Sequence, residues 1–387
     1  MTHRQPAIAR RHLPRDDAFP SRAEALGFGF HSPEGREYWA RDACYVLTQD
    51  AVAAMEAAGR ELNAMIAAAV DHVVARGDYR AFGFSPRLAA LVEHSHRLGE
   101  PSLYGRFDFR LDADGSVKLF EFNAETPAAL LEAASVQLAW FEDTRDRPGS
   151  DQWNAIDDAL VARWPRMNLP HLIHFSAERG REDEIAQVAY LMATARAAGH
   201  DAAFLPVDDI SWQDGAGFVT PDGTPLAACF KLYPWDWLDI EEGGRLLPLG
   251  RTRWIEPARR MLHASKAILV TLWEMFPGHP LLLPASLDRA AIDGPAIGKP
   301  ALGLEGWGMR VEGTGRDEST EAAEGLPASP TIWQQWCPLP GHATPHGDAY
   351  PVMGVWMVGD EPAGLGIREG DDRVTTFEDR FVPHVIL

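Results

Sequence analysis

The sequence predicts an α+β fold, and three patterns support this prediction. Residues 43–75 are rich in alanine and repeat apolar side chains at helical spacing. Two strictly alternating runs flank Asp114-Gly115, as in a β-hairpin. A strand, a helix and a second strand follow one another between residues 172 and 207, which is typical of a βαβ unit with a partly parallel sheet.

Length, charge and cysteine content limit the possible classes of protein. The chain has 387 residues, enough for one large domain or two to three subdomains, and 46% of them are hydrophobic. A formal charge of −20 argues against general nucleic-acid binding, which relies on a basic surface. The three cysteines are scattered, and no apolar run has the length of a membrane span or of a signal-peptide core. We therefore expect a cytoplasmic protein that does not bind membranes.

The N-terminal region is predicted to be an arm followed by helices. Residues 1–20 are basic, contain prolines and lack periodicity, so we expect a mobile or loosely docked arm. The helical pattern of residues 43–75 has Asp50 as a plausible N-cap. A shorter helix is expected at about residues 87–97.

The stretch 104–123 carries the strongest local signal in the chain. If Asp114 and Gly115 are the central residues of a two-residue turn, the alternation separates an apolar face from a polar face. The opposed polar pairs are then Asp108 with Glu121 and Arg106 with Asn123, and the apolar face holds Phe107, Phe109, Leu111, Phe120 and Phe122. Carboxylates that face each other repel, and oxygen ligands of this kind suit Mg²⁺. The alternative is a solvated polar face on which Arg106 pairs with Glu121.

A helix is expected directly after this hairpin. Thr126 has the form of an N-cap and Pro127 that of a first helical residue, and apolar residues continue to about Trp140. Because the N-terminus of a helix attracts anions, a cation site and an anion site would adjoin on one short segment.

The middle of the chain contains the predicted βαβ unit. A helix at 153–164, a buried strand at 172–176, a helix ending near Gly199 and a strand at 204–207 are expected in turn. Residues 218–233 are expected to form a further hairpin around Asp222-Gly223. The acidic run Glu182, Asp183 and Glu184 has two interpretations: the first turn of a helix, where carboxylates complement the dipole, or a site for an ammonium group.

The second half carries a set of lysines and a glycine-rich segment. Lys299 lies on an expected strand, and Gly303-Leu-Glu-Gly306-Trp-Gly308 follows it. A lysine supplies a point charge, and glycines let backbone N–H groups approach phosphate oxygens, although such a segment alone is more often a flexible loop. A strand at 332–336 and a terminal hairpin at 352–369 complete the chain.

Several ordered motifs resemble the glutathionylspermidine synthase family, in particular its short members that lack an amidase domain. These motifs are Arg106-Phe-Asp108, Lys118-Leu-Phe-Glu121-Phe-Asn123-Ala-Glu-Thr-Pro, Phe230-Lys-Leu-Tyr-Pro-Trp235, the segment that begins at Lys266, and Arg368-Glu369. The resemblance covers roughly residues 27–387. It implies an ATP-grasp-type C-terminal half packed on a helical and mixed-sheet, pre-ATP-grasp-like N-terminal half. We accordingly expect an arm at 1–20, a substrate- and Mg-binding region at 21–245 and a nucleotide-binding region at 246–387.

The resemblance also implies an activity, ATP-dependent formation of a C–N bond through an acyl phosphate. The expected substrates are a small peptide such as glutathione and an amine such as spermidine, with ATP and Mg²⁺ as cofactors. The implied roles are Arg106 and Arg368 in catalysis; Asp108, Glu121 and Asn123 at the metal; Thr126, Glu182 and Asp183 at the substrates; and Lys266, Lys299, Gly303, Gly306, Gln334, Gln335 and Trp336 at ATP. Without the resemblance, Arg368-Glu369 is equally typical of a surface ion pair.

Two departures from the family pattern keep other functions open. Leu304 stands where the family usually has an arginine over the triphosphate, and Thr126-Pro-Ala128 stands where the synthase proper has serines that contact glutathione. A ligase with other peptide, amine or amino-acid substrates is one alternative. An ATP-binding protein without turnover is another, and a metal-dependent phosphohydrolase is a third.

Overall fold

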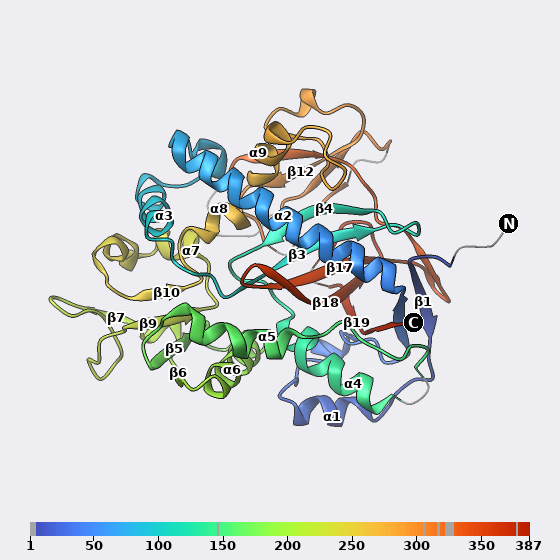
Figure 1. Ribbon diagram of the computed structural model, residues 1–387, viewed down its shortest axis with the longest axis horizontal. Helices are drawn as coiled ribbons and strands as arrows, with labels where there is room; N and C mark the ends of the chain where they lie inside the picture. The colour runs from blue at the N-terminus through green and yellow to red at the C-terminus, as the bar shows by residue number, and fades with distance from the viewer. Residues whose placement is uncertain (1–4, 145–146, 305, 316–317, 322–328, 377) are drawn as a thin grey trace.

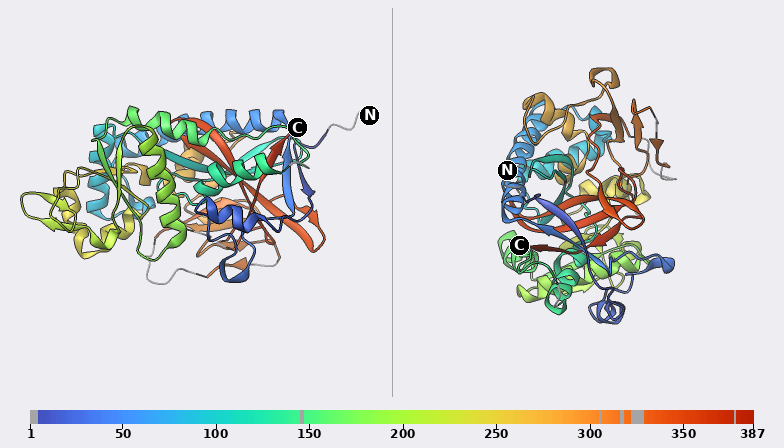
Figure 2. Two further views of the ribbon diagram at one scale, coloured as in Figure 1. Left: turned by 90° about the horizontal axis from the view of Figure 1, so that it is seen from below. Right: turned by 90° about the vertical axis from the view of Figure 1, so that its right-hand side faces the viewer.

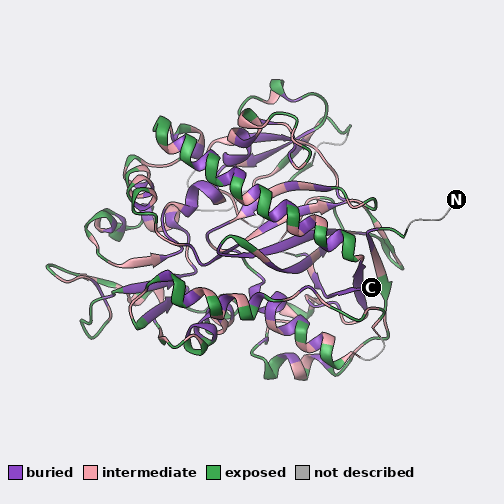
Figure 3. Cartoon of the chain, in the orientation of Figure 1, coloured by how far each residue is buried: buried purple, intermediate pink, exposed green. Residues whose placement is uncertain are grey.

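The computed structural model describes residues 5–144, 147–304, 306–315, 318–321, 329–376 and 378–387. These residues form a mixed α/β structure with five sheets (Figure 1). Buried residues gather in the central sheet and on the inner sides of the helices around it (Figure 3). No helix among the described residues has the length and apolar character that crossing a membrane requires.

The central sheet is antiparallel and joins segments far apart in the sequence. Its strands run in the order β19-β18-β17-β3-β4, with β16 paired to β17. The bounds are β3 Tyr104–Leu111, β4 Val117–Asn123, β16 His342–Thr344, β17 Gly347–Val358, β18 Glu361–Gly370 and β19 Arg380–Val382. The predicted terminal hairpin is thus confirmed as β17 and β18. Because β3 and β17 share a sheet, the boundary expected after residue 245 does not separate two sheets.

The long helix α2 (Gln49–Arg76) lies along one face of the central sheet (Figures 1 and 2). Its N-cap is Thr48, whose side chain accepts a hydrogen bond from Ala51 N, and not the predicted Asp50. Its apolar stripe is buried against Phe107, Phe109 and other side chains of the same core. A second core on the other side of the sheet contains Tyr104 and Trp356.

The hairpin loop differs from the predicted two-residue turn. Asp112 N donates to Ser116 O at 2.9 Å, and Gly115 N donates to Asp112 O at 2.9 Å, so the loop consists of residues 113–115. Gly115 has a φ of 91°, a conformation that glycine adopts without strain. The extra loop residue moves the first cross-strand pairs by one position.

A β-bulge corrects this shift before the polar pairs are reached. Leu119 faces Phe109 while Glu121 faces Asp108, so Phe120 is the extra residue on β4. The predicted Asp108–Glu121 pair is therefore confirmed. The prediction that Phe120 belongs to the core face is wrong, because the bulge turns this half-buried ring to the polar side, where it lines a cavity.

The predicted βαβ unit is confirmed within a four-stranded parallel sheet of order β10-β9-β5-β6, but its second strand covers 201–204 and not the predicted 204–207. Its strands are β5 Leu172–Ser176, β6 Asp201–Phe204, β9 Ala228–Lys231 and β10 Arg253–Ile255. The turn predicted around Asp222-Gly223 is present, because Val219 forms an antiparallel bridge with Pro225. The hairpin predicted to extend to 233 is wrong, because β9 pairs in parallel with β5 while β8 (Gly217–Val219) pairs with β7 (Ser211–Gln213). Isolated local patterns do not reveal such long-range partners. The adjacent helices are α5 Ile156–Arg163 and α6 Glu182–Ala197.

A five-stranded antiparallel sheet carries the expected strand of Lys299. Its order is β11-β15-β12-β13-β14, with bounds β11 Ala285–Ser286, β12 Ala296–Pro300, β13 Arg310–Glu312, β14 Glu318–Ser319 and β15 Thr331–Gln335. Lys266 lies between helices α8 (Arg260–Ala264) and α9 (Ile268–Met275).

The predicted N-terminal arm differs from the structure at residues 8–12. These residues form strand β1 (Ile8–His12), which pairs with β2 (Ala43–Leu47); β2 pairs in parallel with β20 (His384–Ile386). Residues 43–47 are thus a strand and not the start of a helix. The pattern missed β1 because it is short and basic, and a tertiary ion pair with Glu369 holds its Arg10. Residues 1–4 of the predicted arm lie outside the described part of the chain.

The helix predicted to begin at Thr126 begins later. Helical structure covers 130–143 and includes a π-helical turn at Glu132–Val136 followed by α4 Gln137–Asp143. Ala129 has a φ of 71°, so the chain turns sharply before the helix and Thr126 is not its N-cap. The remaining helices are α1 Phe19–Ala25, α3 Pro86–Leu98, which confirms the helix predicted at 87–97, and α7 Trp235–Ile240. Short 3-10 turns occupy Pro33–Gly35, Arg80–Phe82, Trp164–Met167, Val207–Asp209, Glu242–Leu249 and Arg289–Ala291.

Candidate active site

A cavity of about 640 Å³ lies over the polar face of the β3–β4 hairpin. The central sheet, the five-stranded sheet and the start of α6 all contribute to its wall. Most of the predicted site residues line it: Arg106, Asp108, Glu121, Asn123, Thr126, Glu182, Asp183, Lys299, Gly306, Gln334, Gln335, Trp336 and Arg368. Lys266 and Gly303 line a smaller neighbouring cavity of about 60 Å³. The polar face of the hairpin is therefore not the solvated surface of the alternative interpretation.

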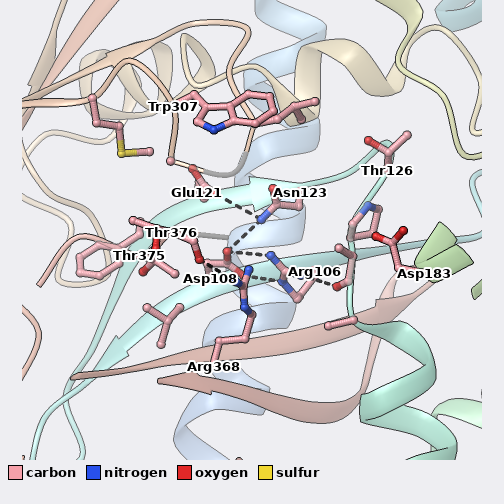
Figure 4. A pocket seen from close by; sticks show the side chains of 18 of the residues that line it. Arg106, Asp108, Glu121, Asn123, Thr126, Asp183, Trp307, Arg368, Thr375 and Thr376 are labelled. Carbon is pink, nitrogen blue, oxygen red and sulfur yellow. Dashed lines mark hydrogen bonds and ion pairs between the residues drawn. The ribbon is translucent and has the colours of Figure 1, made fainter. Parts of the chain in front are cut away.

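Arg106 and Asp108 form a bidentate ion pair at the base of the cavity (Figure 4). Arg106 Nε donates to Asp108 Oδ1 at 2.6 Å, and Nη2 donates to Oδ2 at 3.0 Å. Nη1 donates to the carbonyl of Ala128 at 2.5 Å. Gly354 of β17 faces Asp108 of β3 in the strand register. A Cβ at this position would lie 2.8 Å from Arg106 Cδ, so only glycine leaves room for the Arg106 side chain. Sequence analysis did not identify Gly354.

Glu121 pairs with a lysine and not with Arg106. Lys266 Nζ lies 3.2 Å from Glu121 Oε2 and donates to the carbonyl of Gly303 at 2.7 Å. Burial alone would raise the pKa of Glu121, but Lys266 and Lys299 outweigh it and lower this pKa to about 2. Glu121 is therefore a carboxylate at neutral pH, and one acidic side chain joins the hairpin to both lysines.

Asp108, Glu121 and Asn123 form a compact set of oxygen-bearing side chains. Asn123 Nδ2 donates to Asp108 Oδ2 at 3.0 Å and to Glu121 Oε1 at 3.4 Å (Figure 4). No cluster of three or more His, Cys, Asp or Glu side chains suited to a metal ion occurs within the described ranges. Mg²⁺ commonly uses only one or two carboxylates, with phosphates and waters as its other ligands. Two facing carboxylates beside an amide therefore fit Mg²⁺ in the presence of a phosphate ligand.

Lys299 extends the cationic wall next to the displaced ring of Phe120. Its Nζ donates to Phe120 O at 3.1 Å and lies 5.7 Å from the centre of that ring. Burial lowers the pKa of Lys299 to about 8, with a further lowering by Lys266 and an opposing effect of Glu121. The lysine thus changes charge just above neutral pH unless an anion stabilises its protonated form.

Arg368 faces the cavity from β18, between Arg106 and the segment that contains Thr376 (Figure 4). Its Nη2 donates to Thr376 O at 2.6 Å, while its buried Nε has no hydrogen-bond partner among the described residues. On the same wall, Tyr38 donates to the buried carboxyl of Glu132 at 2.7 Å. Burial raises the pKa of Glu132. Arg368 thus lines the cavity and retains one buried N–H without a partner among the described residues.

The acidic run at residues 182–184 lies at the wall of the cavity that is formed by the start of α6. Glu182, Asp183 and Glu184 form the first turn of α6, which confirms the helix interpretation, and all three line the cavity. Arg181 Nη2 lies 3.4 Å from Asp183 Oδ2 and 3.2 Å from Glu184 Oε1. Burial raises the pKa of Glu184 to about 7. Thr126 lies near Asp183 at this end of the cavity (Figure 4).

Several residues predicted to contact a nucleotide already use their N–H groups in hydrogen bonds within the protein. The backbone N–H groups of Gln335 and Trp336 donate to the carbonyls of Pro284 and Pro295, at 2.8 and 2.9 Å. The side chain of Gln334 donates to Leu119 O at 3.3 Å. Gly306 has a φ of 77°, and a Cβ there would lie 2.4 Å from Thr375 O, so this glycine allows two loops to meet at the cavity. Glu305 of the same loop lies outside the described residues.

Several cavity residues were not identified from the sequence. Phe120 was hidden by the bulge, and Tyr38, Trp307, Thr375 and Thr376 reach the cavity from loops. Local patterns hold little information about loop residues of this kind. Glu132 lies in a segment that resembles the family, but no role followed from that resemblance.

Comparisons with known proteins identify the family of the chain. The chain matches the family model described as glutathionylspermidine synthase preATP-grasp over residues 10–387. A protein of Haemophilus influenzae with the provisional name acid–amine ligase is 34% identical over 399 residues, which cover 96% of this chain and 99% of that protein. Trypanothione synthetase of Crithidia fasciculata is 24% identical over 332 residues, or 78% of this chain and 50% of that protein.

A third relative shares a smaller part of its length. The bifunctional glutathionylspermidine synthetase/amidase of Escherichia coli is 22% identical over 268 residues, which cover 62% of this chain and 42% of that protein. The chain thus spans nearly all of the first relative and half or less of the other two. With a family model that matches almost from end to end, the chain belongs to the glutathionylspermidine synthase family.

Proposed function

We propose that the protein is an ATP-dependent C–N ligase that joins the carboxylate of a small peptide, such as glutathione, to an amine, such as spermidine. Membership of the family and the ligase names of its relatives support this reaction class. The C-terminal part, residues 246–387, would be the ATP-grasp-type region that binds the nucleotide.

One observation carries the proposal. A single cavity has two opposed carboxylates and the buried Lys299 at one end and a row of carboxylates at the other. The first end suits a polyphosphate with a divalent cation, and the second suits an ammonium group. A reaction that consumes ATP and an amine needs both environments within reach of one substrate carboxylate.

The nucleotide end is assigned to the two lysines and the segments beside them. Lys266 and Lys299 would hold phosphate oxygens, and the segment from Gly303 to Gly306 would lie over the phosphates. Gln334, Gln335 and Trp336 would border the base. Because the N–H groups of Gln335 and Trp336 are already bonded, these two residues would contribute side chains and carbonyl groups.

Asp108, Glu121 and Asn123 would hold Mg²⁺, which neutralises phosphate charge when it is bound. Arg106 is held by Asp108 in one orientation, so its guanidinium is ready to stabilise an anion without rearrangement. Arg368 would donate its free Nε–H to the phosphoryl group or to the oxyanion that forms when the amine attacks. The reaction then depends on charge neutralisation and positioning, without a covalent enzyme nucleophile.

Thr126, Glu182 and Asp183 are assigned to the substrates. Thr126 would contact the peptide, and the two carboxylates at the start of α6 would attract the amine. Thr126-Pro-Ala128 lies where the synthase proper has serines that contact glutathione, and this departure favours a peptide other than glutathione as the second candidate substrate.

The buried Lys299 predicts a pH dependence. Burial lowers its pKa to about 8, so the free enzyme carries the ammonium form below that pH and loses it above. We expect kcat/KM for ATP to be level below about pH 8 and to fall roughly tenfold per pH unit above it. Steady-state kinetics of ADP release measure this profile. Lys299→Arg keeps the charge at high pH, so identical profiles for this variant and the wild type would contradict the assignment.

An assay of ADP release over a matrix of small peptides and amines tests the function itself. We expect ADP release that requires one peptide and one amine together, with a condensed product detected by mass spectrometry. Isotopically labelled amines identify the product and separate glutathione–spermidine ligation from ligation of other pairs. ATP that stabilises the protein against heat, without ADP release for any pair, would favour an ATP-binding protein without turnover. Phosphate release without an acceptor would indicate a phosphohydrolase.

A further inference from the structure

The residue that follows Arg368 in β18 is the centre of a buried ion-pair cluster. Glu369 is 0% exposed. Successive side chains of a strand point to opposite faces, so Arg368 faces the cavity while Glu369 points away from it. Interactions that fix the side chain of Glu369 therefore also fix the backbone of its neighbour Arg368.

Glu369 is held mainly by Arg10. Arg10 Nε donates to Oε2 at 2.7 Å, and Arg10 Nη2 donates to Oε1 at 3.0 Å. Tyr45 Oη donates to Oε2 at 2.7 Å, and Arg380 Nη2 donates to Oε1 at 3.0 Å. Burial alone would raise the pKa of Glu369, but Arg10 and its other partners lower it. The carboxylate thus accepts four hydrogen bonds and is fixed from several sides.

The donors come from three strands that meet at one end of the central sheet (Figure 1). Arg10 on β1 faces Tyr45 on β2 in the strand register, and Arg380 on β19 faces Glu369 itself. The side chain of Arg10 is 6% exposed, so solvent screens this ion pair weakly. The N-terminal strand therefore reaches the back of the strand that carries Arg368.

Arg368 has few direct supports of its own. Among the described residues, its hydrogen bond goes to Thr376 O, in a loop, and its Nε remains unpaired. Its position therefore depends on its backbone as well as on the nearby carboxyl groups of Glu132 and Asp379. If Arg10 is removed, Glu369 keeps a buried charge with less compensation, and the strand must shift or admit water.

We propose that Arg10 is a positioning residue for Arg368, so that the N-terminal strand sets the geometry of the cavity through Glu369. This inference rests on the proposed function, because Arg368 acts on the phosphoryl group or the oxyanion only in that reaction. Arg10 itself lies on the other face of the sheet and touches no substrate.

The test measures ADP release by Arg10→Gln with a reactive peptide–amine pair. We expect kcat to fall roughly tenfold or more, because small displacements of a catalytic group are costly. KM for ATP should stay within about twofold, because Lys266 and Lys299 are untouched. Arg10→Lys, which keeps the charge, should restore part of kcat. Arg11→Gln is the matched control, since Arg11 is the next residue of β1 and is exposed.

A double-mutant cycle separates positioning from a general structural effect. If Arg10 acts through Arg368, then Arg10→Gln should cause little further loss of kcat in an Arg368→Ala background. Losses that multiply, as for independent sites, would overturn the proposal, as would a rise in KM for ATP with unchanged kcat. Far-ultraviolet circular dichroism checks the fold, and Arg10→Lys replaces Arg10→Gln in the cycle if the latter does not fold. A wild-type protein that releases no ADP with any substrate pair would instead contradict the proposed function.

Discussion

Asp108→Ala is expected to lower kcat/KM for ADP release by about 100- to 1000-fold, the range typical for loss of a preorganised electrostatic group. The carboxylate has two tasks, because it is assigned to Mg²⁺ and it also holds Arg106 through two hydrogen bonds. Removal of Asp108 therefore weakens the metal site and frees the guanidinium. Steady-state kinetics at several Mg²⁺ concentrations measure both effects, and a partial rescue by high Mg²⁺ would identify the metal contribution.

The same strand offers a matched control. Arg110 binds Asp112 in a similar way, with Nη2 to Oδ1 at 2.6 Å, and neither residue lines the main cavity. Asp112→Ala removes a carboxylate of the same kind and should keep kcat/KM within about threefold of the wild type, because neither Asp112 nor Arg110 reaches the main cavity. Equal effects of the two substitutions would contradict the metal and positioning role of Asp108.

Arg368→Ala is expected to lower kcat by about 100-fold or more, with a smaller change in KM for ATP. The reason is that its guanidinium would act on charge that develops during the reaction, whereas the two lysines hold the ground-state phosphates. The free Nε–H is the observation behind this expectation. Single-turnover kinetics of acyl-phosphate formation and of amine attack identify the step that depends on Arg368.

Arg368→Lys distinguishes charge from geometry. Lysine keeps one positive charge but lacks the planar fork, so we expect activity between those of the wild type and the alanine variant. A lysine variant as active as the wild type would mean that a point charge is sufficient. An alanine variant with unchanged kcat would mean that Arg368 has no role in the reaction.

The β3–β4 hairpin shows which structural features local sequence patterns predict and which they miss. The alternation predicted the pairs Asp108–Glu121 and Arg106–Asn123, and both are confirmed. The three-residue loop and the bulge at Phe120 were missed, and their effects on the register cancel. A bulge leaves little trace in a sequence, because its cause is the packing of the neighbouring layers.

Partners distant in the sequence were harder to predict. Glu121 was expected to meet a metal or Arg106, and its ion pair with Lys266 bridges two residues 145 positions apart, from 121 to 266. The parallel pairing of β9 with β5 and the docking of β1 on β2 were missed for the same reason. Short apolar or charged runs have many possible partners, and only the complete packing selects one of them.

The sequence by itself determined the family, the polar face of the hairpin and many of the charged side chains around the cavity. These features follow from residue types at short spacing, which local chemistry controls. The tertiary structure alone decided that Lys266 meets Glu121, that Phe120 turns to the cavity and that the N-terminal strand reaches the back of Arg368. Such contacts join segments far apart in the chain, and their energies arise only when burial removes water from both partners.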